Sequence, residues 1–197
     1  IVKARVNTHI KLYNYRRQVE YQSRTDQLTG IPNRRQHDQY SLTKWKEAAR
    51  LQVPFSICML DIDHFKAYND TFGHPAGDKV IAAVAKTVSS YLKRSTDFLA
   101  RYGGEEFAAF LVGDTSRKAF EHLKKIRQAV EDLHIAHAPS VAQWVTVSIG
   151  GTTVIPQLDS SYDFHLKVAD AMLYDAKKLG RNQVVWVNEN TEQLREK

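Results

Sequence analysis

Cysteine is almost absent from this sequence of 197 residues, in which Cys58 is the single example. A single cysteine cannot form a disulfide within the chain, which excludes the small, disulfide-stapled class of secreted domain. No apolar stretch approaches the roughly 18 residues of a membrane-spanning helix, and no secretory signal opens the chain. Because it begins with Ile1 instead of methionine, we expect a piece of a longer protein.

Excess charge is lacking over most of the chain. Residues 1–50 hold 11 of the 28 Lys and Arg but only 4 of the 22 Asp and Glu, and the remainder holds 17 and 18. The later part is therefore a poor candidate for a nucleic-acid-binding domain, which would carry a basic surface. The basic excess at the N-terminus fits either a solvated helix face or a linker close to an anionic membrane surface.

The apolar pattern predicts one α/β domain of about residues 24–187, between a linker helix at 1–23 and a frayed polar tail at 188–197. We expect helices at 34–50 (with Asn33 as N-cap), 79–92, 115–135 and 161–179, and a polar connection with a short helical turn at 65–78. We expect strands at 54–63, 97–102, 105–112, 143–151 and 183–187. This order predicts a mixed central sheet of about five strands covered by helices, ferredoxin-like or nucleotidyl cyclase-like, with an N-terminal helical extension.

Carboxylates stand where predicted strands end or begin. Asp61 and Asp63 close the first strand, and Glu105 and Glu106 follow a pair of glycines. Paired glycines between strands predict a tight hairpin, because its turns need positive φ, and we expect both glutamates at the start of the next strand. If these strands are neighbours, Asp61 and a hairpin glutamate offer the oxygen ligands that Mg²⁺ prefers beside a polyphosphate. An exposed hairpin tip with solvated glutamates is the alternative.

Other polar residues would suit a nucleotide. Lys66, Lys177 and Arg181 are candidate phosphate partners, since Lys offers a point charge and Arg a bidentate grip. Asn69 and Asp78 flank a polar loop, and together they complement the N–H groups of guanine better than those of adenine. Each of these residues could also be an ordinary loop or capping residue.

Six segments, in order, resemble the GGDEF family of diguanylate cyclases in its GGEEF form. The resemblance covers about residues 21–187 and rests on "DQLTGIPNRR" (26–35), "DIDHFKAYNDTFGHPAGD" (61–78), "RSTD" (94–97), "GGEEF" (103–107), "SIGG" (148–151) and "YDAKKLGRN" (174–182). The one departure from the family name is a glutamate at position 105 in place of aspartate, and the family's active members use both.

The resemblance implies that two GTP molecules are condensed into cyclic di-GMP, with release of two pyrophosphates. It implies two Mg²⁺ ions per site, for which Mn²⁺ could substitute, held by Asp61, Glu105 and the carbonyl of Ile62. Glu106 would support the metal site or help to deprotonate the attacking hydroxyl. Each domain would bind one GTP, so a homodimer is required, and the 1–23 helix would promote it.

By the same resemblance, Asn69 and Asp78 would read guanine. The phosphates would be held by Lys66, Lys177, Arg181 and the backbone of Phe65, and the implied catalytic set is Glu105, Glu106 and Lys66. We expect a cytoplasmic domain, supplied with GTP and Mg²⁺. The upstream sensor, or a region anchored in the inner membrane, would belong to the longer protein.

Arg94 and Asp97 match the family's RxxD inhibitory site for cyclic di-GMP, although a weak surface ion pair is the alternative. The strand between them and the hairpin turn places this site roughly 15–20 Å from the turn. Bound product would then act by holding domains in a non-productive arrangement. Further basic partners could come from Arg117, Lys124, Lys125 or Arg127.

Three other functions compete with this hypothesis. A catalytically silent receptor for GTP or cyclic di-GMP would share the fold, but such members usually lose the GG[DE]EF residues, which this chain keeps. A cyclase or polymerase-palm-like enzyme acting on another nucleotide would not need Asn69 and Asp78. A nucleic-acid-binding ferredoxin-like module would need a basic sheet face with interleaved aromatic residues, which the sequence does not predict.

Overall fold

The computed structural model of this chain describes residues 10–13, 24–188 and 193–195. Residues 10–13 are helical, and the rest of the predicted 1–23 helix lies outside the described residues. The strands are β1 (Phe55–Ile62), β2 (Asp97–Gly103), β3 (Glu106–Val112), β4 (Val147–Val154), β5 (Val184–Asn188) and β6 (Gln193–Arg195). The helices that follow residue 24 are α2 (Arg34–Leu51), α3 (Phe65–Phe72), α4 (His74–Tyr91), α5 (Ser116–Glu131) and α6 (Tyr162–Lys178).

The strands form one mixed sheet in the order β2-β3-β1-β4-β5-β6, in which β4 and β5 are parallel and the other neighbours antiparallel. The central strand β1 sends Cys58 and Leu60 into one core and Phe55 and Ile57 into a second core. A strand buried on both faces reads as a continuous apolar run, which is why residues 54–63 predicted it well. The expected mixed sheet covered by helices is confirmed.

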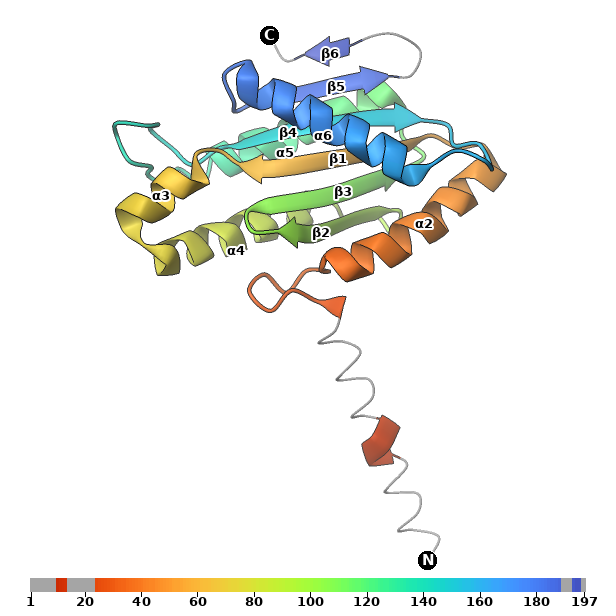
Figure 1. Cartoon of the computed structure of the whole chain (residues 1–197), viewed down its shortest axis with the longest axis horizontal. Coiled ribbons are helices and arrows are strands. Elements are labelled where there is room, and N and C mark those ends of the chain that lie inside the picture. The colour runs from red at the N-terminus through yellow and green to blue at the C-terminus, as the bar shows by residue number, and fades with distance from the viewer. Residues whose placement is uncertain (1–9, 14–23, 189–192, 196–197) are drawn as a thin grey trace, which may run out of the picture.

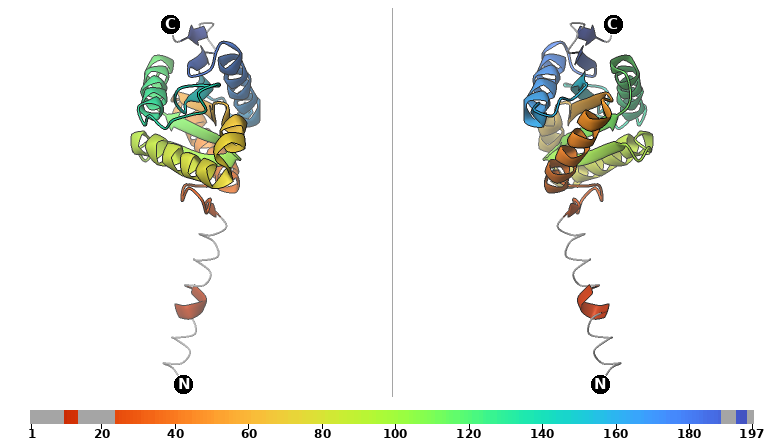
Figure 2. Two further views of the ribbon diagram at one scale, coloured as in Figure 1. Left: turned by 90° about the vertical axis from the view of Figure 1, so that its left-hand side faces the viewer. Right: turned by 90° about the vertical axis from the view of Figure 1, so that its right-hand side faces the viewer.

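Helices cover both faces of the sheet, α4 and α5 on one side and α2 and α6 on the other (Figure 2). Helix α6 approaches β4 very closely, since a Cβ on Gly150 would lie 1.8 Å from the backbone nitrogen of Leu173. Glycine at this position therefore lets α6 pack against the strand. The C-terminal end of α6 then lies at the same end of the sheet as the end of β1 and the β2–β3 hairpin (Figure 1).

The segment 65–78 is more helical than predicted. Helix α3 occupies Phe65–Phe72, and α4 begins at His74 instead of residue 79. Gly73, with φ of 82°, separates the two helices. Proline lies in the first turn of α4, where its fixed φ and missing N–H favour helix initiation, so the apolar spacing alone placed this boundary too late.

Three other expectations need correction. Helix α5 ends at Glu131 instead of 135, and β4 begins at Val147 instead of 143. In the described residues the sheet gains a sixth strand beyond the five expected, because residues 193–195 of the tail predicted to fray pair with β5. A three-residue strand made by backbone pairing leaves no apolar alternation in the sequence. Within the described residues, no helix combines the length and apolarity needed to cross a membrane.

Candidate active site

The carboxylate of Asp61 lies at the end of the central strand and faces the β2–β3 hairpin. In the antiparallel register of β1 and β3, Asp61 is the partner of Glu106. Asp61 is 6% exposed, and its Oδ2 lies 2.8 Å from Nζ of Lys177 near the end of α6. Strand pairing thus brings Asp61 to the hairpin glutamates, as the sequence analysis expected.

The surroundings of Asp61 disfavour its negative charge. Burial, together with the nearby charges of Glu105 and Glu106, raises the pKa of Asp61 to about 6, although Lys177 acts in the opposite direction. When the pKa of a carboxylate is raised although a lysine lies beside it, the site has too little positive charge to balance its acids. The cluster is therefore suited to bind a cation.

The hairpin turn is shifted by one residue from the prediction. Gly103 is the last residue of β2 and pairs with Glu106, so the loop consists of Gly104 and Glu105. Of the two loop residues only Gly104 has positive φ, at 52°, which is the sign pattern of a type II′ turn. Glu105 therefore lies in the turn itself, and the expectation that it begins a strand is wrong.

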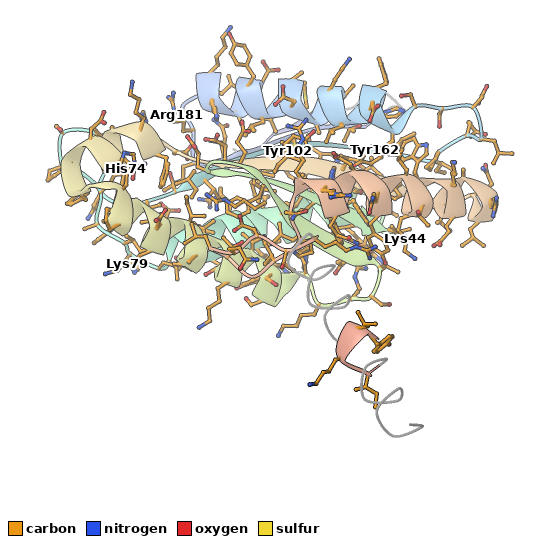
Figure 3. The ribbon with its side chains drawn as sticks, turned by 60° about the horizontal axis from the view of Figure 1, so that its bottom comes forward. Lys44, His74, Lys79, Tyr102, Tyr162 and Arg181 are labelled. Carbon is orange, nitrogen blue, oxygen red and sulfur yellow. The ribbon has the colours of Figure 1, made fainter. Side chains whose placement is uncertain are left out.

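A groove between α2 and α6 shows which face of the sheet Glu106 occupies. This cavity of about 600 Å³ is lined by Met59 of β1, Tyr102 of β2, Glu106 of β3 and Tyr162 of α6, among others. Tyr102 and Tyr162 lie near the middle of the molecule, whereas Arg181 and His74 lie toward one end (Figure 3). Glu106 therefore lines this groove and is also the strand partner of Asp61 near the end of β1.

The predicted guanine residues lie on the two helices that follow β1. Asn69 is on α3 and the exposed Asp78 is on α4. A Cβ on Gly77 would lie 1.9 Å from Oδ1 of Asn69, so glycine is needed for the helices and this amide to meet. Oδ1 of Asn69 is buried and has no hydrogen-bond partner in the described part of the chain. Such an acceptor suits a ligand that brings its own N–H group.

The predicted phosphate residues differ in their surroundings. Lys66 is exposed on α3, and no side chain caps the first amides of that helix, which include Phe65. Free amides at a helix N-terminus favour an anion. Arg181 follows α6 in a left-handed conformation, with φ of 65°. Lys177 instead pairs with Asp61, so a phosphate would have to compete for it.

Asp63 does not join the carboxylate cluster. It is 3% exposed and accepts hydrogen bonds from Oγ1 of Thr146 at 2.7 Å, Oγ of Ser148 at 2.6 Å and the amide of Asn182 at 3.0 Å. A carboxylate saturated by three donors is a structural anchor. Because Asn182 follows Arg181, this anchor also positions the Arg181 loop, a role that the sequence did not reveal.

Arg101 connects the segment before α2 to the hairpin. Its Nε donates to the carbonyl of Gly104 at 2.8 Å, and its Nη1 pairs with Asp26 at 3.0 Å. Burial alone would raise the pKa of Asp26, but hydrogen bonds from Thr29 and the charge of Arg101 outweigh it and lower that pKa. This link was also missed, although the resemblance included both Asp26 and the residues around the turn.

Arg94 and Asp97 form an ion pair that has a third member, and its inhibitory role stays a prediction. Nη2 of Arg94 lies 2.8 Å from Asp97 and 2.5 Å from Asp114, a residue that was not among the predicted partners. Asp97 begins β2, so this cluster lies at the opposite end of that strand from the hairpin. Arg127, one of the suggested further partners, is 8% exposed and bonded to Glu131 and Asn182, so it is unavailable there.

The residues present can accommodate Mg²⁺ at the end of β1. Among the described residues, no group of three or more His, Cys, Asp or Glu side chains forms a ready-made metal cage. Magnesium is usually held by one or two carboxylates with substrate phosphates, so the predicted set of Asp61, Glu105 and the Ile62 carbonyl would be enough without such a cage. The raised pKa of Asp61 supports this fit.

Comparisons with known proteins show which family this chain belongs to. The family model described as "Diguanylate cyclase, GGDEF domain" matches residues 23–183. The chain is 34% identical over 176 residues to a protein named probable diguanylate cyclase DgcC of Escherichia coli, covering 89% of this chain and 46% of that protein. It is 38% identical over 164 residues to diguanylate cyclase VdcA of Vibrio cholerae, with 81% and 46% covered. The chain spans about half the length of these relatives.

Solved structures resemble the chain as well. The coiled coil and GGDEF domain of DgcB from Caulobacter crescentus, in complex with cyclic di-GMP, superposes with a TM-score of 0.84 at 31% identity, covering 94% of this chain and 99% of that one. An active GGEEF domain of a diguanylate cyclase from Vibrio cholerae gives 0.69 at 29% identity, with 81% and 98% covered. With a family model matching most of its length, this chain belongs to the GGDEF domain family of diguanylate cyclases.

Proposed function

We propose that this domain condenses two GTP molecules into cyclic di-GMP and releases two pyrophosphates. The observation that carries the proposal is the pairing of β1 with β3, which sets the buried Asp61 against Glu106 and beside Glu105. This cation-seeking cluster lies at the same end of the sheet as the two helices that hold Asn69 and Asp78. A metal-assisted reaction of a guanine nucleotide fits both features.

The catalytic roles follow from these positions. Asp61, Glu105 and the Ile62 carbonyl would hold two divalent ions, of which Mg²⁺ is the first choice and Mn²⁺ a substitute. Bound Mg²⁺ would lower the pKa of a ribose 3′-hydroxyl and offset charge at the α-phosphate. Glu106, the strand partner of Asp61 at the start of β3, would support the ions or accept the hydroxyl proton. Lys177 would move from Asp61 to a phosphate oxygen once cations satisfy the carboxylate.

Substrate recognition would use the two helices after β1. The orphaned Oδ1 of Asn69 would accept an N–H of guanine, and the carboxylate of Asp78 would accept another. Lys66, Arg181 and the free amides at the start of α3 would hold the phosphates. Adenine presents no matching pair of N–H groups on this edge, so we expect selection for GTP.

The proposed reaction requires a homodimer. One domain offers one nucleotide site, so the 3′-hydroxyl of each GTP must reach the α-phosphate held by a second copy. The linker of residues 1–23 would promote this pairing. We place the domain in the cytoplasm, where GTP and Mg²⁺ are supplied, with input from a sensor or membrane region of the longer protein. Product would inhibit through Arg94 and Asp97.

The direct test is to incubate the purified chain with GTP and Mg²⁺ and to separate the nucleotides by chromatography. Cyclic di-GMP should form with the wild type and be lost with Glu105→Ala and Glu106→Ala, while thermal melts check that both variants fold. If GTP binds but no product appears, the assay is repeated with a dimerising fusion. Product from the fusion alone would assign the failure to weak dimerisation, and continued absence would point to a receptor and refute the proposal.

A further inference from the structure

Arg94 has more hydrogen-bond donors than the carboxylate of Asp97 can accept. A guanidinium carries five N–H groups, one on Nε and two on each terminal nitrogen. Nε contacts both oxygens of Asp97, at 3.1 and 3.2 Å, and Nη2 contacts Oδ1 of the same carboxylate at 2.8 Å. One side edge of the guanidinium is therefore committed to Asp97, and the end formed by Nη1 and Nη2 remains for other partners.

Asp114 occupies part of that remaining end. Its Oδ2 lies 2.5 Å from Nη2 of Arg94, across 20 residues of sequence, while Nη1 makes no hydrogen bond or ion pair within the described residues. Asp114 directly precedes Thr115, and Thr115 caps α5 by accepting from the amide of Lys118. The carboxylate of Asp114 is thus not needed as the helix cap, and Arg94 is its ion-pair partner in the described structure.

The two carboxylates differ in how firmly they hold Arg94. The side chain of Asp97 is 1% exposed and also accepts from the Arg94 amide at 3.2 Å, so releasing it would strand a buried charge. The side chain of Asp114 is 18% exposed and makes a single contact, through an arginine that is itself 47% exposed. The contact with Asp114 is therefore the one that a ligand can replace.

We propose that Asp114 competes with the guanine base of cyclic di-GMP for the free end of Arg94 and thereby weakens product binding. The inference rests on the proposed inhibitory site at Arg94 and Asp97. Arginine reads guanine by donating two parallel hydrogen bonds to O6 and N7, and this requires two neighbouring nitrogens to be free at once. While Nη2 donates to Asp114, Nη1 and Nη2 together can make only one of the two hydrogen bonds to guanine.

The negative charge of Asp114 should also weaken the binding of cyclic di-GMP. Cyclic di-GMP carries two phosphate charges, and Asp114 adds a negative charge beside the arginine that would receive it. The pKa of Arg94 is raised, first by the hydrogen bond to Asp114 and next by that to Asp97, so both carboxylates act on the charged guanidinium. Neutralising Asp114 should release the end of Arg94 and remove repulsion of the ligand, leaving the buried Asp97 contact in place.

The test is calorimetric titration of cyclic di-GMP into the wild-type chain and Asp114→Asn. The amide keeps the size and shape of the carboxylate, so we expect the dissociation constant to fall by about three- to tenfold. Asp132→Asn is the matched control, because it removes an acidic charge at the C-terminal end of α5, where the carboxylate accepts from Gln128 instead of pairing with Arg94. A control that tightens binding as much as Asp114→Asn would overturn the proposal, since net charge would then explain the effect.

Two variants of Arg94 separate this inference from the site on which it rests. Arg94→Ala and Arg94→Lys should both bind cyclic di-GMP at least tenfold more weakly, the lysine because it cannot donate a bidentate pair, and melts show whether each folds. If these variants lose binding but Asp114→Asn does not tighten it, the competition by Asp114 is refuted and the inhibitory site stands. If folded Arg94 variants bind as the wild type does, the inhibitory site itself is wrong and the inference falls with it.

Discussion

Two aspartates only two residues apart at the end of β1 lie in opposite chemical surroundings. Asp61 has one cationic partner, Lys177, and its pKa is raised by burial and two neighbouring glutamates. Asp63 receives three hydrogen bonds and positions the loop of Arg181. Burying the charge of Asp61 therefore destabilises the folded state, whereas the hydrogen bonds of Asp63 stabilise it. The comparison teaches that a carboxylate in a cation site has few hydrogen-bond donors around it. A carboxylate that holds the surrounding structure in place has all the donors it can use.

The largest expected effect is on catalysis, through Asp61→Asn. Loss of a charged oxygen from the proposed metal site should lower the rate of cyclic di-GMP formation by about 100-fold or more. Because the folded state disfavours the Asp61 charge, the melting temperature should stay level or rise. Initial rates and thermal melts measure both, with Asp70→Asn on α3 as an exposed control. Normal activity in Asp61→Asn would remove this residue from the metal site.

Asp63→Asn should lower stability, in contrast to Asp61→Asn. An amide places an NH₂ group against the donors of Thr146, Ser148 or the Asn182 backbone, so we expect a loss of about 2–3 kcal/mol in the free energy of unfolding. For a chain of this size that corresponds to a fall of roughly 4–12 °C in melting temperature. Urea unfolding measures it, beside Asp132→Asn as a control. A stable variant with lost activity would reverse the comparison between the two aspartates.

Gly77→Ala tests whether Asn69 binds guanine in the proposed GTP site. The new Cβ would meet Oδ1 of Asn69, so this amide must move, and GTP affinity should fall by about tenfold. Asn69→Ala should weaken GTP binding by a similar factor. If Gly77→Ala acts through Asn69, the double variant should lose little more than either single change. Fully additive losses would show that the glycine acts by another route.

The smallest expected effect concerns His37, a fully buried histidine whose Nε2 lies 2.9 Å from the hydroxyl of Tyr162. Burial lowers the pKa of His37 below its ordinary value of 6.5, and Asp38 only partly opposes this. Below pH 6.5 the unfolded chain therefore binds more protons than the folded one, so stability falls as the pH drops. Melting temperatures at pH 7.5 and 5.5 should differ more in the wild type than in His37→Gln. Equal differences would exclude His37 as the cause.

Most of the candidate site could be predicted because the chemistry of a GGDEF domain is carried by short segments. The run at 61–78 contains Asp61, Lys66, Asn69 and Asp78, and the strand and helices around it have clear local signals. The errors lie where a local signal is weak. Gly103 and Gly104 equally suggested a turn, and only the register with Glu106 decided between them. The short strand β6 depends on pairing with β5 and leaves no apolar pattern of its own.

The amino-acid sequence by itself determined which carboxylates, amides and basic groups are present, that β1 is buried, and that α2 begins after Asn33. These properties follow from composition and from spacing over a few residues. Only the tertiary structure decided that Asp61 meets Lys177 across 116 residues, that Asp63 is saturated, and that Asp114 reaches Arg94. Such contacts depend on strand register and on how α5 and α6 pack against the sheet, and no periodicity along the chain encodes the distance between two side chains that folding brings together.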